Sequence, residues 1–211
     1  MKKFELTNEF ITNMFGTKLF RIRALVEFGD VEAGELGGYV EKESNLGHDG
    51  NAWVCGNAWV CGNAQVSGNA RVCGDAQVSG DARVYDNAWV YGDAQVSGDA
   101  RVYGNARVYG NAWVYGNAWV YGNALVCSDE DYAYAHGFGS VNRTTTFFRL
   151  KDGGVGVRCG CFYGTLAQFR DKIRETHGET KKAQEYLMLA DLMELRFEED
   201  ENEVGNRKYV E

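Results

Sequence analysis

The residues of this chain that could carry chemistry are three histidines, six cysteines, and a set of arginines interleaved with Trp and Tyr. Histidine is the usual general base near neutral pH, provided that it can reach the proton it removes. His48 and His136 flank the regular part of the sequence, and His177 precedes Gly178, where a cation suits a helix C-terminus. We therefore expect structural roles for all three and predict no catalytic residue, and hence no enzyme.

Three cysteines and a histidine raise the question of a metal site. Cys127, His136, Cys159 and Cys161 could form a Cys3His zinc site if the fold brings them together. The simpler interpretation is that Cys159 and Cys161 alternate with two valines along one strand, so that both thiols face the core. On this interpretation the sequence predicts no metal ion and no other cofactor.

One repeat dominates the elements that must position these residues. From Gly50 to Cys127 the chain consists of 13 consecutive hexads, mostly Gly, Asn or Asp, Ala, a variable residue, Val, and then Cys, Ser or Tyr. Gly and Asn tolerate the backbone angles of a sharp corner, and the Ala–variable–Val segment has the period of a β-strand. Ala and Val should therefore point inward and the variable residue outward.

The number of hexads in one coil can also be inferred. The block GDAQVSGDARVY occurs at 74–85 and again at 92–103, a shift of three hexads. A single hexad cannot bury a core, so the hexads must stack as a solenoid, and the shift predicts three sides per coil. Two degraded hexads, from Gly38 and Ser44, extend the solenoid to about five coils and place His48 in a Val position.

The repeat resembles the left-handed parallel β-helix of hexapeptide-repeat proteins, and the handedness is implied by that resemblance alone. We predict a mostly β protein with three regions: an N-terminal β-hairpin cap over 1–37, the three-sided β-helix over 38–128, and a C-terminal α+β module over 129–211.

The two ends should cover the open edges of the solenoid. We expect one hairpin that turns near Gly16 and a second hairpin over 143–162. Two helices should follow, one from a capping box at Thr165 to Gly178 and one over 181–196. The tail at 197–211 is charged, and we expect it to be loose.

Stacked coils arrange the outward residues in columns that hold the candidate binding residues. Exposed aromatic rows are typical of protein interfaces. We therefore predict a homo-oligomer, with a trimer as the first expectation and a dimer as the second, formed through the face of Trp53 and Trp89. That face stacks Trp53, Arg71, Trp89, Arg107 and Leu125, with Tyr91 and Tyr109 at its corner.

A second column could bind an anion. Arg83 stacks on Arg101, and the neighbouring corner column contains Tyr85, Tyr103 and Tyr121. Guanidinium groups bind anions and stack on aromatic rings, so this surface could clamp an anion or a nucleotide. The alternative is that Asp81 and Asp99 neutralise the two arginines.

The general properties of the chain limit its location and its partners. The N-terminus lacks the apolar stretch of a secretory signal and no run of 18 apolar residues exists, so we expect no export and no membrane span. Cys55 and Cys73 share a corner at a disulfide-compatible ~4.8 Å, but we expect thiols in a reducing cytosol. The net charge of -8 argues against general nucleic-acid binding.

The segments outside the repeat carry a further resemblance. LFRIRAL, GELGGYVEKESNLGHDGNAWV and TTTFFRLKDGGVGVRCGCFYGTLAQF resemble a group of bacteriophage and prophage proteins, which implies the cytoplasm of a bacterial host. The predicted function is a non-enzymatic phage accessory protein that acts as an oligomeric binding or interaction scaffold, with a host protein or a small anionic ligand as partner and a possible counter-defence role. The alternatives are a divergent hexapeptide acyltransferase and a protein that sequesters an anionic, nucleotide-like ligand.

Overall fold

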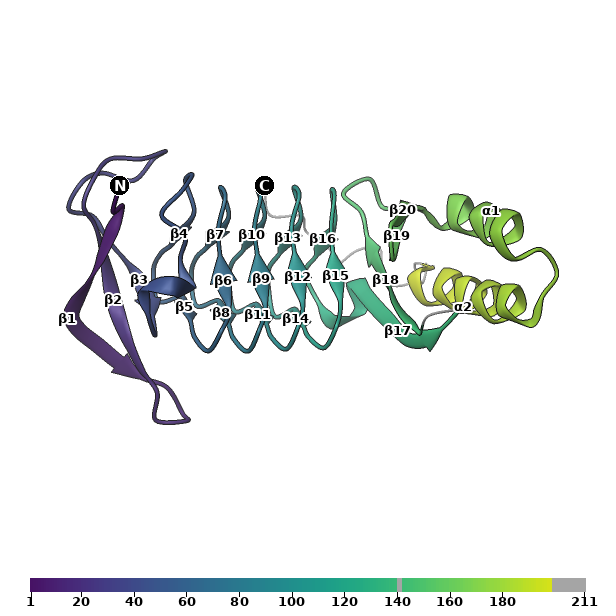
Figure 1. Cartoon of the computed structure of the whole chain (residues 1–211), viewed down its shortest axis with the longest axis horizontal. Coiled ribbons are helices and arrows are strands. Elements are labelled where there is room, and N and C mark those ends of the chain that lie inside the picture. The colour runs from purple at the N-terminus through teal and green to yellow at the C-terminus, as the bar shows by residue number, and fades with distance from the viewer. Residues whose placement is uncertain (140–141, 199–211) are drawn as a thin grey trace.

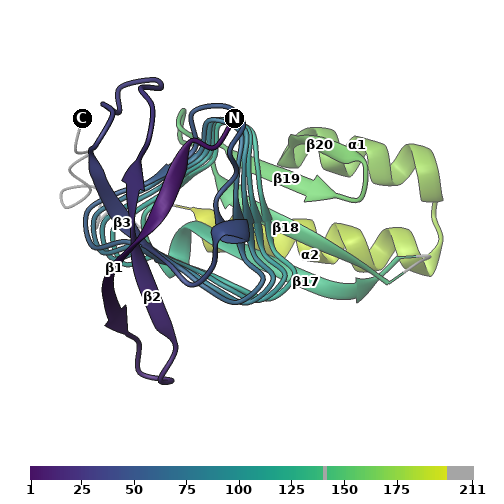
Figure 2. The same cartoon turned by 60° about the vertical axis from the view of Figure 1, so that its left-hand side comes forward.

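The chain forms a rod in the computed structural model, which describes residues 1–139 and 142–198 (Figure 1). A β-hairpin and a third strand stand at one end, the stacked coils occupy the middle, and a small sheet with two helices forms the other end. Figure 2 shows the coils nested behind one another, with the N-terminal strands lying across the first coil. The expected solenoid with capped ends is therefore confirmed, and its handedness stays a prediction.

Each coil contributes one short strand to each of three parallel faces, because successive strands on one face are three hexads apart in the sequence. Each face is named after one outward-pointing residue. The Trp89 face contains β4 (Trp53–Val54), β7 (Arg71–Val72), β10 (Trp89–Val90), β13 (Arg107–Val108) and β16 (Leu125–Val126). The Trp113 face contains β5 (Trp59–Val60), β8 (Gln77–Val78), β11 (Gln95–Val96) and β14 (Trp113–Val114). The Arg101 face contains β6 (Gln65–Val66), β9 (Arg83–Val84), β12 (Arg101–Val102) and β15 (Trp119–Val120).

The core of the solenoid is a narrow stack of Ala and Val, all buried as predicted. Glycine is required at the corners for two reasons, which Gly98 illustrates. Its φ is +67°, and a Cβ there would lie 3.0 Å from the backbone nitrogen of Gly116 in the next coil. The repeat therefore keeps Gly wherever corners stack closely, and only Asp86 takes a Gly position, with a φ of 59°.

The first coil departs from the predicted register. Val40 pairs with Val60 and Leu46 with Val66, so the offset exceeds three hexads by two positions. The predicted placement of His48 in a Val position is therefore wrong, because two extra residues lie between Leu46 and the next coil and Leu46 fills the core. The half-buried His48 ring stacks on Phe4 instead and lies 2.8 Å from Glu43.

Buried side chains donate hydrogen bonds to the unpaired backbone carbonyls at the N-terminal end of the solenoid. Along the solenoid, N–H groups such as that of Trp53 donate to carbonyls of the following coil, so the first coil presents carbonyls that no earlier coil can pair. The Lys3 ammonium donates to the carbonyls of Gly50 and Ala52, at 3.2 and 2.8 Å. The Asn45 amide donates in the same way to the carbonyls of Gly62 and Ala64, at 3.1 and 2.8 Å.

The C-terminal end presents the opposite groups and uses the opposite caps. The backbone N–H groups of the last coil have no following coil, and acceptor side chains take their place. Asp129 accepts from Trp113 N–H at 2.7 Å, Thr146 from Trp119 N–H at 2.9 Å, and Asp131 from Cys127 N–H at 3.0 Å. Two short 3₁₀ helices, Glu43–Asn45 and Asp129–Asp131, hold several of these capping side chains.

The N-terminal cap buries a residue that the sequence places on the surface. β1 (Phe4–Thr12) and β2 (Lys18–Ala24) form the predicted hairpin around Gly16, and β3 (Leu36–Val40) joins it to the Trp113 face. Trp53 is fully buried beneath this cap and meets the Phe28 ring edge-on at 5.3 Å. The prediction that Trp53 belongs to an exposed interface is therefore wrong, because the first coil is covered.

The C-terminal module is a four-stranded antiparallel sheet followed by two helices. The predicted hairpin corresponds to β18 (Arg143–Arg149) and β19 (Val155–Cys159), while β17 (Tyr132–Phe138) and β20 (Phe162–Thr165) are additional strands. The helices α1 (Leu166–His177) and α2 (Lys181–Phe197) follow the prediction, including the capping box of Thr165 and Gln168. The tail at 199–211 lies outside the described residues.

The cysteines differ from the prediction in two places. Cys55 and Cys73 form a disulfide between adjacent coils, with Cα atoms 4.6 Å apart, so the expectation of thiols is wrong. Cys161 is exposed instead of facing the core. Gly160, with a φ of +58°, turns the chain directly after Cys159 and interrupts the alternation along the strand.

The capping role of Lys3 predicts a pH dependence of stability. Burial lowers the pKa of Lys3 from 10.5 to about 8. Between these values the folded chain binds fewer protons than the unfolded chain, so the free energy of unfolding should rise with pH, by about 1–3 kcal/mol. Urea denaturation from pH 7.5 to 10.5 should show this rise in the wild type and not in Lys3→Met. The neighbouring Lys2 is exposed, so Lys2→Met should keep it, and equal slopes in all three proteins would contradict the assignment.

Candidate functional site

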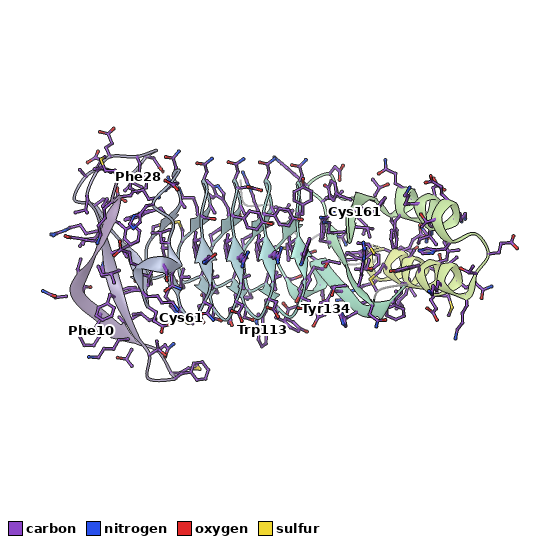
Figure 3. The ribbon with its side chains drawn as sticks, in the orientation of Figure 1. Phe10, Phe28, Cys61, Trp113, Tyr134 and Cys161 are labelled. Carbon is purple, nitrogen blue, oxygen red and sulfur yellow. A yellow bond between two sulfur atoms is a disulfide. The ribbon has the colours of Figure 1, made fainter. Side chains whose placement is uncertain are left out.

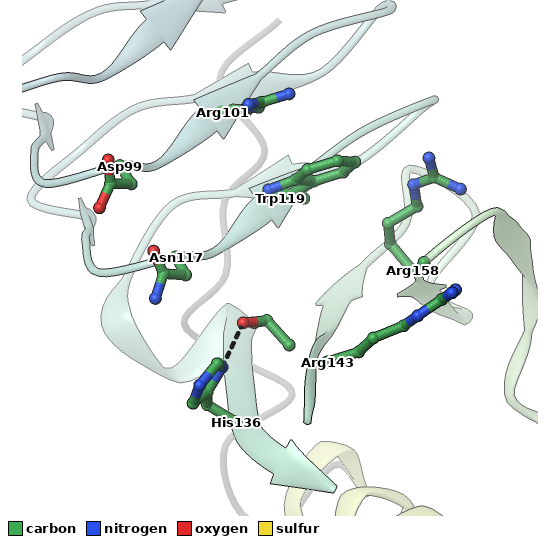
Figure 4. A pocket seen from close by; sticks show the side chains of 9 residues that line it. Asp99, Arg101, Asn117, Trp119, His136, Arg143 and Arg158 are labelled. Carbon is green, nitrogen blue, oxygen red and sulfur yellow. Dashed lines mark hydrogen bonds between the residues drawn. The ribbon is translucent and has the colours of Figure 1, made fainter. Parts of the chain in front are cut away.

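A cleft of about 620 Å³ lies where the Arg101 face meets the C-terminal sheet (Figure 4). The solenoid and the C-terminal module both contribute to its walls, although their residues lie far apart in the sequence. The residues that line it are Asp99, Arg101, Asn117, Trp119, His136, Arg143, Thr144, Arg158 and Gly160.

Regular elements position most of these side chains. Arg101 and Trp119 are neighbours in register on β12 and β15, as a period of three hexads requires. On the other side, β18 and β19 contribute Arg143 and Arg158. The hydrogen bond from Trp119 N–H to the Thr146 hydroxyl joins the last coil to β18, the strand that carries Arg143.

Trp119 organises two of the three arginines. The guanidinium carbon of Arg101 lies 4.6 Å from the centre of the indole ring, and that of Arg158 lies 5.2 Å from it. In Figure 4 Arg101 approaches from the preceding coil and Arg158 from the C-terminal module. A cation over an indole face is stabilised by the negative face of the ring. Both guanidinium groups are therefore held near the cleft, and the indole is engaged by cations from both directions.

Arg143 reaches the cleft across a glycine. A Cβ at Gly160 would overlap a terminal nitrogen of Arg143. No residue with a side chain fits at this position while Arg143 keeps its place. Gly160 therefore both turns the chain after β19 and leaves room for the third guanidinium group.

The three arginines of the cleft form no ion pair within the described part of the chain, although Asp99 also lines the cleft. Other arginines form ion pairs, as Arg71 does with Asp30 and Arg170 with Asp191 and Glu194. In residues 1–139 and 142–198, by contrast, no carboxylate forms an ion pair with the guanidinium groups of Arg101, Arg143 or Arg158. Three such cations side by side in a protein of net charge -8 make this cleft a local site of positive potential.

His136 adds an exposed imidazole to the lining of the cleft. Its Nδ1 lies 2.9 Å from the Thr144 hydroxyl, which fixes the ring. No residue of the described chain lies within hydrogen-bond distance of its Nε2. This nitrogen could therefore exchange a proton with a bound molecule, as a general base or acid does.

The predicted Arg and Tyr columns lie partly in this site. Arg101 lines the cleft, whereas Arg83 is exposed and lies outside it. Tyr85, Tyr103 and Tyr121 stack on one another at 4.8 and 4.3 Å. Burial raises the pKa of Tyr103 although the Arg158 guanidinium opposes the shift. Tyr103 is thus stacked between two tyrosines, and Tyr85 stacks on one tyrosine only.

The predicted neutralisation of Arg83 and Arg101 by aspartates is not found in the described residues, because neither arginine forms an ion pair with Asp81 or Asp99. Asp81 instead accepts a hydrogen bond from Asn63 at 3.1 Å.

On the Trp89 face the candidate residues form pairs. Arg107 lies over the Trp89 ring at 5.9 Å, and Tyr91 stacks on Tyr109 at 5.1 Å. Trp89 is 47% exposed. Trp113 is equally exposed on its own face and projects from the solenoid in Figure 3. The exposed aromatic surface is therefore divided between two faces.

The three cysteines of the candidate zinc site and His136 do not form one cluster in the described structure. Cys127 donates to Asp131 at 2.8 Å, and the Cys159 thiol accepts from the Thr145 hydroxyl at 3.1 Å. Among the residues that the structure describes, no three potential ligands are grouped so that they could hold a metal ion. No described helix is long and apolar enough to cross a membrane.

The sequence alone does not identify most of the residues that line the cleft. Trp119, Arg143, Arg158 and Asn117 become neighbours only because the C-terminal sheet packs against the last coil. One signal was available: Arg143 and Arg158 lie in the two expected strands that directly follow the repeat.

Comparison with known proteins agrees with the solenoid. A protein-family model described as the YdcK beta solenoid repeat matches the chain at residues 64–76, 76–92, 94–110, 100–116 and 106–122. All of these segments lie in the stacked coils, so the similarity concerns the repeat and not the C-terminal module. No curated protein matches the chain.

Proposed function

We propose that this chain is a binding protein that captures a small anionic ligand in the cleft between the Arg101 face and the C-terminal sheet. The observation that carries the proposal is the set of three guanidinium groups, of Arg101, Arg143 and Arg158, without a carboxylate partner in the described chain. Arginine presents several N–H donors in a planar fork that matches phosphate and carboxylate groups. The volume of the cleft suits a small molecule.

The geometry favours an anion over a flat aromatic ligand. A nucleotide base would have to stack on Trp119, but Arg101 and Arg158 lie over that ring. Phosphate or carboxylate groups can instead bind the other guanidinium N–H groups while the cation–indole contacts remain. Nη1 of Arg158 already donates to the Phe162 carbonyl at 3.1 Å. Trp119 then acts as a support that holds two arginines in place before the ligand arrives, which lowers the entropic cost of binding.

Isothermal titration calorimetry with inorganic pyrophosphate tests this proposal. Charge-assisted hydrogen bonds contribute about 1.5–3 kcal/mol each, so Arg143→Gln and Arg158→Gln should each weaken binding by about tenfold or more. Arg83→Gln is the matched control, because Arg83 occupies the same column as Arg101 outside the cleft and should leave the affinity within about twofold. Absence of pyrophosphate binding by the wild type, or an equal loss in Arg83→Gln, would refute the proposal.

A second candidate function is acyl transfer, and the position of His136 favours it. The hexapeptide acyltransferases use a histidine base beside the acyl donor, and here a histidine lies in the same cleft as the three arginines. If this function holds, the wild type should consume acetyl-CoA in the presence of amine or alcohol acceptors, and His136→Gln should abolish turnover while pyrophosphate binding persists. Turnover that survives His136→Gln would exclude this histidine as the base.

The phage accessory role, the oligomeric scaffold and the cytoplasmic location belong to the same proposal. The resemblance of the end segments to phage and prophage proteins supports the first and the last. The exposed Trp89 and Trp113 support self-association, now without Trp53. Buried aromatic residues commonly dominate association energies.

Light scattering tests the interface. The double change Trp89→Ala, Tyr91→Ala should shift an assembly toward monomer, whereas the matched pair Trp113→Ala, Tyr115→Ala on the neighbouring face should leave it intact. A wild type that is monomeric at high micromolar concentration would rule out self-association, and the reverse response of the two pairs would move the interface to the Trp113 face.

A further inference from the structure

The cleft has two walls of different chemistry. Figure 4 shows Arg143 and Arg158 on one side of Trp119 and the side chains of Asp99 and Asn117 on the other, with Arg101 on the same coil as Asp99. Asp99 and Asn117 stand at one corner of successive coils, three hexads apart in the sequence. The second wall presents a carboxylate and a carboxamide, which the capture of a simple anion does not require.

The hydrogen bonds between corner side chains of successive coils do not include Asp99 and Asn117. In the corner ladders the amide of one coil donates to the side-chain oxygen of the next, as Asn63 does to Asp81 at 3.1 Å and Asn57 to Asp75 at 3.1 Å. The Asn69 corner continues in this way through Asn87 and Asn105. A carboxylate has no hydrogen to donate, so the ladder that starts at Asn63 stops at Asp81. In the described chain, the side chains of Asp99 and Asn117 consequently have no hydrogen-bond partner.

We infer that the ligand is a phosphorylated sugar, with its phosphate on the three arginines and its hydroxyl groups on Asp99 and Asn117; this inference rests on the proposed anion-binding function. A carboxylate accepts hydrogen bonds from hydroxyl groups, and a carboxamide both donates and accepts, as vicinal hydroxyl groups require. An ammonium group could also donate to Asp99, but the three guanidinium groups beside it would repel a cation. Neutral hydroxyl groups therefore fit this wall better than an amine.

Asp99 also provides selectivity. Its negative charge faces the same space as the arginines and lowers the attraction for a bare anion. A ligand that supplies hydroxyl donors offsets this loss, because hydroxyl groups form charge-assisted hydrogen bonds with the exposed carboxylate of Asp99. The pair of walls thus discriminates against inorganic phosphate and in favour of a sugar that carries a phosphate group.

Calorimetry with inorganic phosphate, glucose, glucose 6-phosphate and ribose 5-phosphate tests this inference. We expect at least one sugar phosphate to bind the wild-type protein at least tenfold more tightly than inorganic phosphate does. Asp99→Ala should lower the affinity for that sugar phosphate at least fivefold and, because it removes a negative charge, should raise the affinity for inorganic phosphate. Asp81→Ala is the matched control, one coil earlier and outside the cleft, and should change neither affinity by more than about twofold.

The outcomes separate this inference from the proposed function. If inorganic phosphate or pyrophosphate binds in an Arg143-dependent manner but neither sugar phosphate binds more tightly than phosphate, anion capture stands and the sugar-phosphate inference is overturned. The inference is also overturned if Asp99→Ala raises the affinity for every anion alike. If no anion binds at all, the proposed function itself fails.

Discussion

An open parallel solenoid must satisfy the backbone groups at its two ends, and this requirement governs the rest of the structure. Because the N–H groups of one coil donate to carbonyls of the next, the first coil presents carbonyls and the last coil presents N–H groups. Six polar or charged residues are buried in the described chain, and four of them cap these groups: Lys3 and Asn45 at the carbonyl end, and Asp131 and Thr146 at the N–H end. Lys3 and Asn45 thus donate at one end, and Asp131 and Thr146 accept at the other, where the Tyr132 hydroxyl also donates to the Trp113 carbonyl at 2.6 Å.

The candidate site is a consequence of the way in which the C-terminal end is closed. The bond from Trp119 to Thr146 places β18 against the last coil. That placement moves Arg143 and Arg158 to within reach of the Arg101 and Trp119 column. The cleft could not exist in the middle of the solenoid, where each face continues into the next coil. A single set of contacts therefore stabilises the end of the fold and provides three cations with a common space.

The sequence was most informative where its period was strict. The duplication at a spacing of three hexads predicted the faces, the columns and the inward Ala and Val, and the capping box at Thr165 predicted the start of α1. The predictions from the sequence were wrong where the repeat period is broken or where a segment distant in the sequence packs against the repeat. Two extra residues after Leu46 shifted the first coil, and the hairpin covered Trp53.

The disulfide between Cys55 and Cys73 was geometrically foreseeable, but the expected reducing environment argued against it. The cleft combines residues from β12, β15, β18 and β19, and no local pattern specifies that packing.

We propose that the closed C-terminal end of the solenoid is also the ligand site. Hydrogen–deuterium exchange of the full chain, with and without saturating inorganic pyrophosphate, tests it most directly. We expect added protection in peptides that cover 98–121 and 143–160 and no change in 1–40, because the ligand should contact both walls of the cleft and leave the other end unchanged. Pyrophosphate-dependent protection that avoids the junction, or that is as large in the N-terminal cap, would contradict the claim.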